Sequence, residues 1–210
     1  MAQQQTDHTG RWVLLSTIMA SSMGFISGSA LNVALPALQN ALDATAADLL
    51  WITNGYLLLL ASLILVGGSL GDHYGRRRIF GYGIWLFVAG SALSGLSNSV
   101  ILLIGFRVVQ GLGGAMMIPG SLAIISAYFD DDERGGAIGL WSAFTSATTV
   151  GGPIIGGFLA DQQLWQTVPF ISPAVAAEMW RGVFFMNVPL AAISLYALYT
   201  HVPESRDTEA

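Results

Sequence analysis

A short charged segment between two long apolar stretches carries the residues best suited to electrostatic chemistry. Residues 68–80 read GSLGDHYGRRRIF, whereas residues 49–71 and 79–106 contain no charged side chain. Asp72 stands at the C-terminal end of a predicted helix, where the helix dipole disfavours an acid. We therefore expect Asp72 to pair with a cation, and Arg76, four residues on, is the local candidate.

A second charge lies inside an apolar stretch. Arg107 is the only ionisable residue deep in a predicted span. Burying a guanidinium in a membrane costs at least ~2.5–3.5 kcal/mol, so polar partners must offset that cost. Gln110, one helical turn on, is placed to share such a network, which would tune proton or substrate binding. The alternative is that Arg107 snorkels to the nearer membrane interface.

Hydroxyl side chains line one face of another predicted helix. They occur at i, i+3, i+4 and i+7, as Ser142, Thr145, Ser146 and Thr149. Hydroxyl groups gain nothing by facing lipid, so this face should meet a cavity or a neighbouring helix. Tight helix packing is the alternative to a cavity, because Ser and Thr are common in packed membrane interfaces.

The same helix contains a proline and several glycines one turn later. Pro153 removes a backbone hydrogen bond and bends the helix. The glycines around it, Gly152, Gly156 and Gly157, permit close contact and flexing. This pattern predicts a hinge or gate, and a static kink is the alternative.

Polar, aromatic and thioether side chains on several predicted helices suit a cavity for varied lipophilic ligands. With the hydroxyl face, the candidates are Ser27, Asn32, Asn54, Tyr56, Met116, Met117, Trp141, Ser142, Thr145 and Thr149. Taken singly, each residue type is more often part of a packed core than a ligand contact.

The elements that must position these residues are membrane-spanning helices. Only 10% of residues are charged and 53% are hydrophobic, against roughly a quarter charged in soluble domains. Gly67, Gly71 and Gly75 repeat at i, i+4 and i+8, a spacing that lets another helix approach closely. Hydropathy predicts six spans of about 20 residues: Trp12–Ala37, Leu49–Gly71, Ile79–Leu96, Val100–Phe129, Gly135–Ala160 and Gly182–Val202.

The distribution of arginine predicts the orientation of these spans. If both termini are cytoplasmic, six arginines fall inside, namely Arg11, Arg76, Arg77, Arg78, Arg134 and Arg206, and Arg181 alone falls outside. We therefore expect a multi-pass protein of the plasma membrane, in contact with the lipid bilayer. The chain has no basic stripe for nucleic acid, and it has no cysteine for disulfides or thiolate metal sites.

Several motifs along the chain resemble those of one transporter family. Residues 68–77 look like the loop motif of the major facilitator superfamily, and four other segments resemble further motifs of its fourteen-helix drug:proton antiporters: 31–36, 107–113, 152–157 and the pair 180–181 and 187–189. The resemblance implies a latch that binds and releases a second six-helix bundle, formed by Gly68, Asp72, Gly75, Arg76 and Arg77. The alternative is that the three arginines only hold this loop in the cytoplasm. It also implies protons as the coupling ion, and no other cofactor or metal.

Two departures from that family pattern matter. The antiporters usually place an acid and a threonine before the first-helix motif, where this chain has Ser27 and Ser29. No predicted span contains Asp or Glu, so a first-helix carboxylate is not available as proton carrier. The family fold also needs two six-helix bundles, and this chain resembles the N-terminal one.

The prediction is therefore an all-α polytopic membrane protein with one six-helix transmembrane bundle. Residues 1–11 are expected to form a cytoplasmic tail, 12–202 the bundle, and 203–210 a tail or the start of a linker. The expected function is proton-coupled export of small amphipathic compounds by alternating access, with a second bundle as partner. The alternative is a fragment that is inactive alone. An enzyme is disfavoured, because the chain has no metal-binding spacing and no membrane carboxylate pair.

Overall fold

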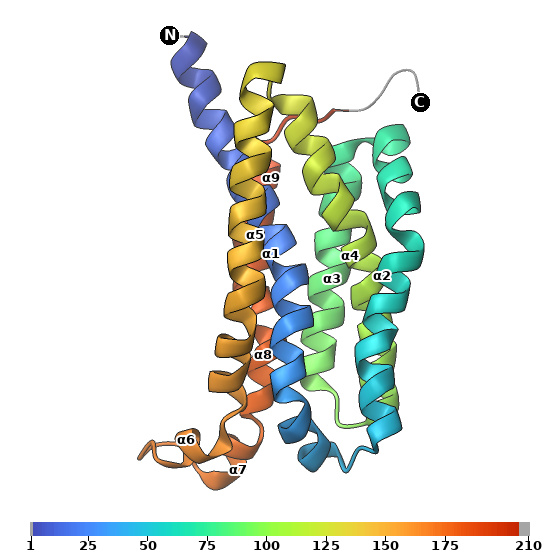
Figure 1. Ribbon diagram of the computed structural model, residues 1–210, viewed down its shortest axis with the longest axis vertical. Coiled ribbons are helices and arrows are strands. Elements are labelled where there is room, and N and C mark those ends of the chain that lie inside the picture. The colour runs from blue at the N-terminus through green and yellow to red at the C-terminus, as the bar shows by residue number, and fades with distance from the viewer. Residues whose placement is uncertain (1, 206–210) are drawn as a thin grey trace.

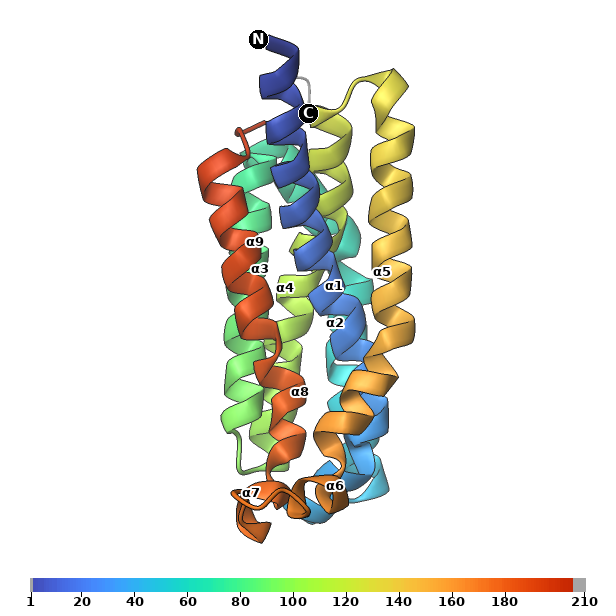
Figure 2. The ribbon, with the colours of Figure 1, turned by 90° about the vertical axis from the view of Figure 1, so that its left-hand side faces the viewer.

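In the computed structural model the chain is a bundle of long helices that run alternately up and down, with both ends of the described residues at one end of the bundle (Figures 1 and 2). The structure describes the backbone of residues 2–205 and the side chains from Thr9 onward. Within these residues no strand occurs. The long helices are α1 (Ala2–Leu42), α2 (Ala46–Tyr74), α3 (Arg76–Leu96), α4 (Val100–Tyr128), α5 (Asp131–Ala160) and α9 (Asn187–His201).

The six predicted spans and the all-α class are confirmed, because six helices are long and apolar enough to cross a membrane. Two of the six spans differ most from the prediction. Helix α1 begins within the predicted tail and continues past Pro36 to Leu42. The last span is broken at Met186 into α8 (Gly182–Phe185) and α9, and it is preceded by the 3-10 turn η1 (Met179–Arg181).

Two short helices lie at the end of the bundle opposite to the termini. They are α6 (Gln162–Gln166) and α7 (Pro173–Ala177), and they belong to the connection between α5 and η1. Figure 1 shows this connection projecting sideways beyond α5, at the level of the turn between α1 and α2.

Glycines allow the helices to approach each other at backbone distance. A Cβ on Gly67 of α2 would fall on the carbonyl of Ala115 in α4. This confirms the close approach predicted for the first glycine of the i, i+4, i+8 series. The prediction is wrong for Gly71, whose added Cβ would have Arg76 Cα as its nearest neighbour, at 3.9 Å. Gly75 faces a different segment, which is described below.

Burial is uneven among the spans. In the most apolar stretch of α1, 67% of residues are buried, whereas the corresponding value for both α2 and α5 is 17%. Exposed apolar side chains on these two helices include Leu65 and Val66 of α2 and Val150 and Ile154 of α5. The described bundle therefore presents two long apolar faces that its own helices do not cover.

Candidate functional site

A buried arginine lies at the centre of the bundle. Arg107 of α4 has no exposed surface. Its Nε donates to the carbonyl of Ile52 in α2 at 3.2 Å, and its Nη1 donates to Gln110 Oε1 at 2.6 Å. The guanidinium carbon lies 4.3 Å from the centre of the Tyr56 ring, a cation–π contact that is strengthened by the absence of water. The alternative in which Arg107 snorkels to the interface is wrong.

Gln110 extends this contact into a chain of neutral polar groups. Its Nε2 lies 3.4 Å from Ser27 Oγ in α1, and Asn187 Nδ2 of α9 donates to the same oxygen at 2.9 Å. Asn187 Nδ2 also lies 2.9 Å from Ser91 Oγ in α3, which donates to the carbonyl of Phe184 in α8 at 2.9 Å. We call this set, from Ile52 through Arg107 to Phe184, the central polar network. It joins every long helix except α5.

Two atoms of the central polar network have no hydrogen-bond partner within the described residues. They are Arg107 Nη2, a donor, and Asn187 Oδ1, an acceptor, and both are buried. Within the described residues, the partners of the Arg107 guanidinium are a carbonyl, an amide and an aromatic ring, and none is a carboxylate. Because a buried cation without a counter-ion depends on its neutral partners, removing any of them should be costly.

The charged loop between α2 and α3 has the local pairing that the sequence predicts. Arg76 Nε and Nη2 both lie 2.8 Å from Asp72 Oδ1. Gly75 takes a φ of +106°, a backbone conformation that favours glycine, and it separates the two helices. The turn thus keeps Asp72 and Arg76 one helical turn apart on consecutive helices.

The segment after α9 binds this loop, a contact that sequence reasoning missed. The backbone N–H of Arg77 donates to Glu204 Oε1 at 3.0 Å, and the backbone N–H of Arg76 donates to the carbonyl of Ser205 at 2.8 Å. Arg77 also donates to the carbonyl of Tyr199 at 2.9 Å. The first two bonds cap the N-terminus of α3, and the third satisfies a carbonyl in the last turn of α9. The only sign of this contact in the sequence is an acidic residue, Glu204, shortly after the last predicted span.

Replacing Asp72 with asparagine separates a latch role from a purely structural one. The Asp72–Arg76 pair is partly exposed, with 37% and 20% of the two side chains accessible, so it contributes roughly 0.5 kcal/mol or less to stability. If Asp72 belongs to the latch that the resemblance implies, Asp72→Asn should leave the melting temperature nearly unchanged and reduce the transport expected from the sequence severalfold. Transport equal to the parent chain would contradict the latch.

The hydroxyl face of α5 borders a shallow pocket. Ser142, Thr145, Ser146 and Thr149 line it together with Trp141 and Phe25, and its volume is about 240 Å³. Trp141 is buried and donates through Nε1 to Ser21 Oγ at 3.1 Å. The face therefore meets a pocket rather than a packed helix over most of its length.

The glycines near Pro153 make a close seam between α5 and α1. A Cβ on Gly152 would collide with Ser29 Oγ, and one on Gly156 would collide with the carbonyl of Ala30. The seam explains these two glycines by packing. Pro153 and Gly157 lie on the less buried side of α5, and the hinge remains a prediction.

The predicted cavity set is not brought together. Tyr56 and Met117 are core residues, buried at 2% and 0% exposure. Tyr56 donates to the carbonyl of Gly24 at 3.1 Å. Asn32 and Asn54 are exposed on α1 and α2, and Met116 is half-buried near Gly83 of α3. The prediction is wrong for Tyr56 and Met117, because sequence spacing does not show which helix face turns inward. Ser27 lies in the central polar network instead.

The sequence matches the profile of the Major Facilitator Superfamily over residues 17–210. The chain belongs to the Major Facilitator Superfamily. Among superfamily members, it is 38% identical to the tetracenomycin C resistance and export protein of Streptomyces glaucescens, over 94% of this chain and 34% of that protein. It is 34% identical to the methylenomycin A resistance protein of Bacillus subtilis (strain 168), over 96% of this chain and 41% of that protein.

Solved superfamily structures have the same fold. A bacterial homolog of the human lysosomal transporter Spinster, inward-facing and unoccupied, matches with a TM-score of 0.75 at 22% identity, over 94% of this chain and 44% of that one. A proton:xylose symporter matches with a TM-score of 0.75 at 15% identity, over 95% of this chain and 46% of the symporter. The chain corresponds to the N-terminal half of these longer transporters, and it spans about a third to two fifths of the curated relatives above.

Proposed function

We propose that this chain forms the N-terminal half of an exporter of small amphipathic compounds, which works by alternating access and is driven by protons. The observation that carries the proposal is its 38% identity to a resistance and export protein over nearly its whole length. Relatives named for multidrug resistance, at 36% identity, support the same substrate class. The membrane would be the plasma membrane, with both termini in the cytoplasm.

The proposal includes a second six-helix bundle as partner. The apolar faces of α2 and α5 are the least covered by the described helices, and the pocket beside Trp141 opens on α5. A second bundle placed over these faces would close the pocket into a cleft. The second bundle would be either a second copy of this chain or a C-terminal half.

Where the second bundle is a C-terminal half, the proton-carrying group would belong to that half, because no predicted span of this chain contains Asp or Glu. The central polar network consists of arginine, glutamine, asparagine, serine and backbone carbonyls, and none of these groups is a carboxylate or an imidazole. Its role in the proposal is to hold the helices other than α5 as one body while the cleft opens and closes.

The test is efflux of a fluorescent lipophilic dye from bacteria that lack their own exporters. Three strains are compared: one with the chain alone, one with the chain and a separately expressed C-terminal half of the tetracenomycin relative, and one with two copies joined by a flexible linker. We expect efflux from at least one paired strain and its loss on adding a protonophore. Equal dye retention in all three strains and an empty-vector control, with the proteins present in the membrane, would overturn the proposal.

A second candidate is a bundle that inserts but does not transport alone. This candidate is favoured because the chain covers only 34% and 41% of the lengths of the two relatives above. Efflux from the strain that carries the chain alone would exclude this second candidate if the detergent-solubilised protein is a monomer. If the protein is a dimer, the same efflux would not exclude it, because the second copy would serve as the second bundle.

A further inference from the structure

The connection between α5 and η1, residues 161–178, is a feature that the proposed function leaves unexplained. We call it the distal segment. Its residues 162–177 read QQLWQTVPFISPAVAA and contain no charged side chain. A solvated loop of this length would ordinarily carry charges, so its composition is that of a segment in contact with apolar material.

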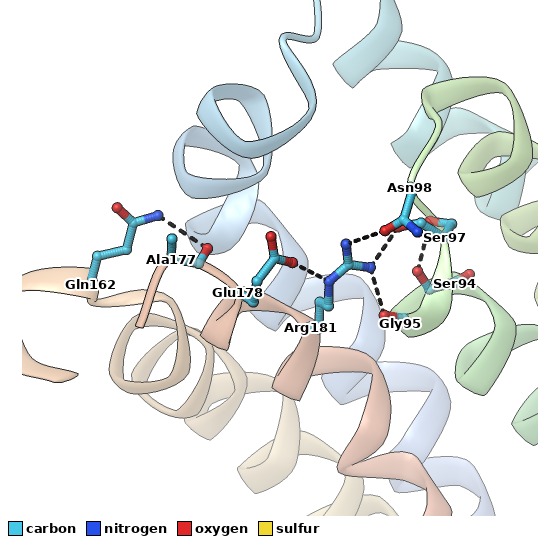
Figure 3. A network of polar contacts seen from close by, with 8 residues as sticks. All are labelled: Ser94, Gly95, Ser97, Asn98, Gln162, Ala177, Glu178 and Arg181. Carbon is cyan, nitrogen blue, oxygen red and sulfur yellow. Dashed lines mark hydrogen bonds and ion pairs between the residues drawn. The ribbon is translucent and has the colours of Figure 1, made fainter. Parts of the chain in front are cut away.

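The distal segment is firmly held at its base (Figure 3). Gln162 Nε2 donates to the carbonyl of Ala177 at 3.3 Å and ties its two ends together. Arg181 bonds to Glu178 and also donates to the carbonyl of Gly95 at 2.8 Å and to Asn98 Oδ1 at 2.8 Å. The base of the segment is thus fixed to the turn between α3 and α4, and its tip projects outward.

Apolar side chains of the distal segment face outward. Phe170 is 97% exposed, Val175 53% and Leu164 40%. Trp165 packs edge-on against Phe158 of α5 with ring centres 5.0 Å apart, and its Nε1 donates to the carbonyl of Phe158 at 2.9 Å. The apolar surface of α5 therefore continues through Phe158 and Trp165 onto the segment.

We propose that the distal segment lies in the interfacial region of the membrane leaflet at this end of the bundle, with lipid as the partner of Phe170, Leu164 and Trp165. Three observations carry the proposal: the segment projects sideways from the ends of the spans (Figure 1), its residues 162–177 are uncharged, and the apolar side chains of Phe170 and Leu164 are exposed. Aromatic side chains favour this depth because their rings meet acyl chains while nearby polar groups stay hydrated.

The test uses the absence of cysteine from the sequence. Phe170→Cys is labelled with a nitroxide, and the full chain is reconstituted in phosphatidylcholine vesicles. Power-saturation EPR then measures accessibility to oxygen, which concentrates in lipid, and to a water-soluble nickel chelate. Two further single-cysteine variants serve as references: Asp132→Cys, exposed at the opposite end of the bundle, and Trp85→Cys, exposed in the middle of α3.

We expect the label at Phe170 to be about threefold less accessible to the nickel chelate than the label at Asp132, with oxygen accessibility between the two references. Nickel accessibility equal to that at Asp132 would overturn the proposal, because the segment would then lie in water. Low accessibility to both reagents would overturn it too, because protein would then cover the segment. Phe170 is almost fully exposed, so its replacement should leave the fold intact, as gel filtration of the labelled protein will check.

Discussion

Lysine in place of Arg107 should lower the free energy of unfolding by about 2 kcal/mol, although it keeps the positive charge. The guanidinium donates to the Ile52 carbonyl and to Gln110 Oε1 at the same time, and its central carbon lies over the Tyr56 ring. A single ammonium group cannot meet both acceptors with the same geometry, and one buried oxygen would lose its donor. Thermal unfolding in detergent, followed by the intrinsic fluorescence of the six tryptophans, measures the effect.

The matched control for this substitution is Arg78→Lys. Arg78 lies in the first turn of α3 and is exposed, so the same change there should leave the unfolding transition within experimental error. An Arg107→Lys protein as stable as the Arg78→Lys protein would mean that the central polar network does not depend on the planar guanidinium. In the proposed exporter, Arg107→Lys should also reduce efflux about tenfold, since the helices would no longer be held as one body.

We expect the second large loss of stability when Gly113 is replaced by alanine, which adds a single methyl group. A Cβ there would fall within 2.8 Å of Phe87 Cα and 2.7 Å of the Gly83 carbonyl, both backbone atoms of α3. Backbone cannot move aside as a side chain can, so α3 and α4 must separate. We expect Gly113→Ala to destabilise the bundle by about 2 kcal/mol, the typical cost of overpacking, measured by the same unfolding transition.

Gly105 on the same helix supplies the control for Gly113. A Cβ at Gly105 would have no neighbour within 4 Å. Alanine is the better helix former by up to about 1 kcal/mol, so Gly105→Ala should be neutral or slightly stabilising. If both variants unfold alike, the contact between α3 and α4 does not require glycine.

The sequence predicts well those features that depend on neighbouring residues. Apolar length is local, so six spans were predictable, and the Asp72–Arg76 pair followed from a four-residue spacing. The partners of Arg107 were not predictable beyond Gln110. Ile52 lies 55 residues earlier in the chain, and only the packing of α2 against α4 brings its carbonyl to the guanidinium.

The inward or outward direction of a side chain was the main source of error. Tyr56 and Asn54 are two residues apart on one helix, and both suited a cavity by residue type. In the structure Tyr56 is buried under Arg107, whereas Asn54 is exposed. An almost uniformly apolar helix has little periodicity, so hydropathy could not separate its two faces. Asn187 was noticed as part of a motif, but its contacts with Ser27 and Ser91 required the fold.

The members of the central polar network are synthesised and inserted into the membrane in a fixed order. Ribosomes release the chain from its N-terminus, so α1 and α2 reach the membrane before the arginine of α4 does. The helices that carry Ile52 and Ser27, the contacts of Arg107 and Gln110 in the folded bundle, are therefore made first. Asn187 follows on the order of ten seconds later at ordinary translation rates. The charged helix can thus be accommodated by earlier neighbours, and the last span completes the bundle around it.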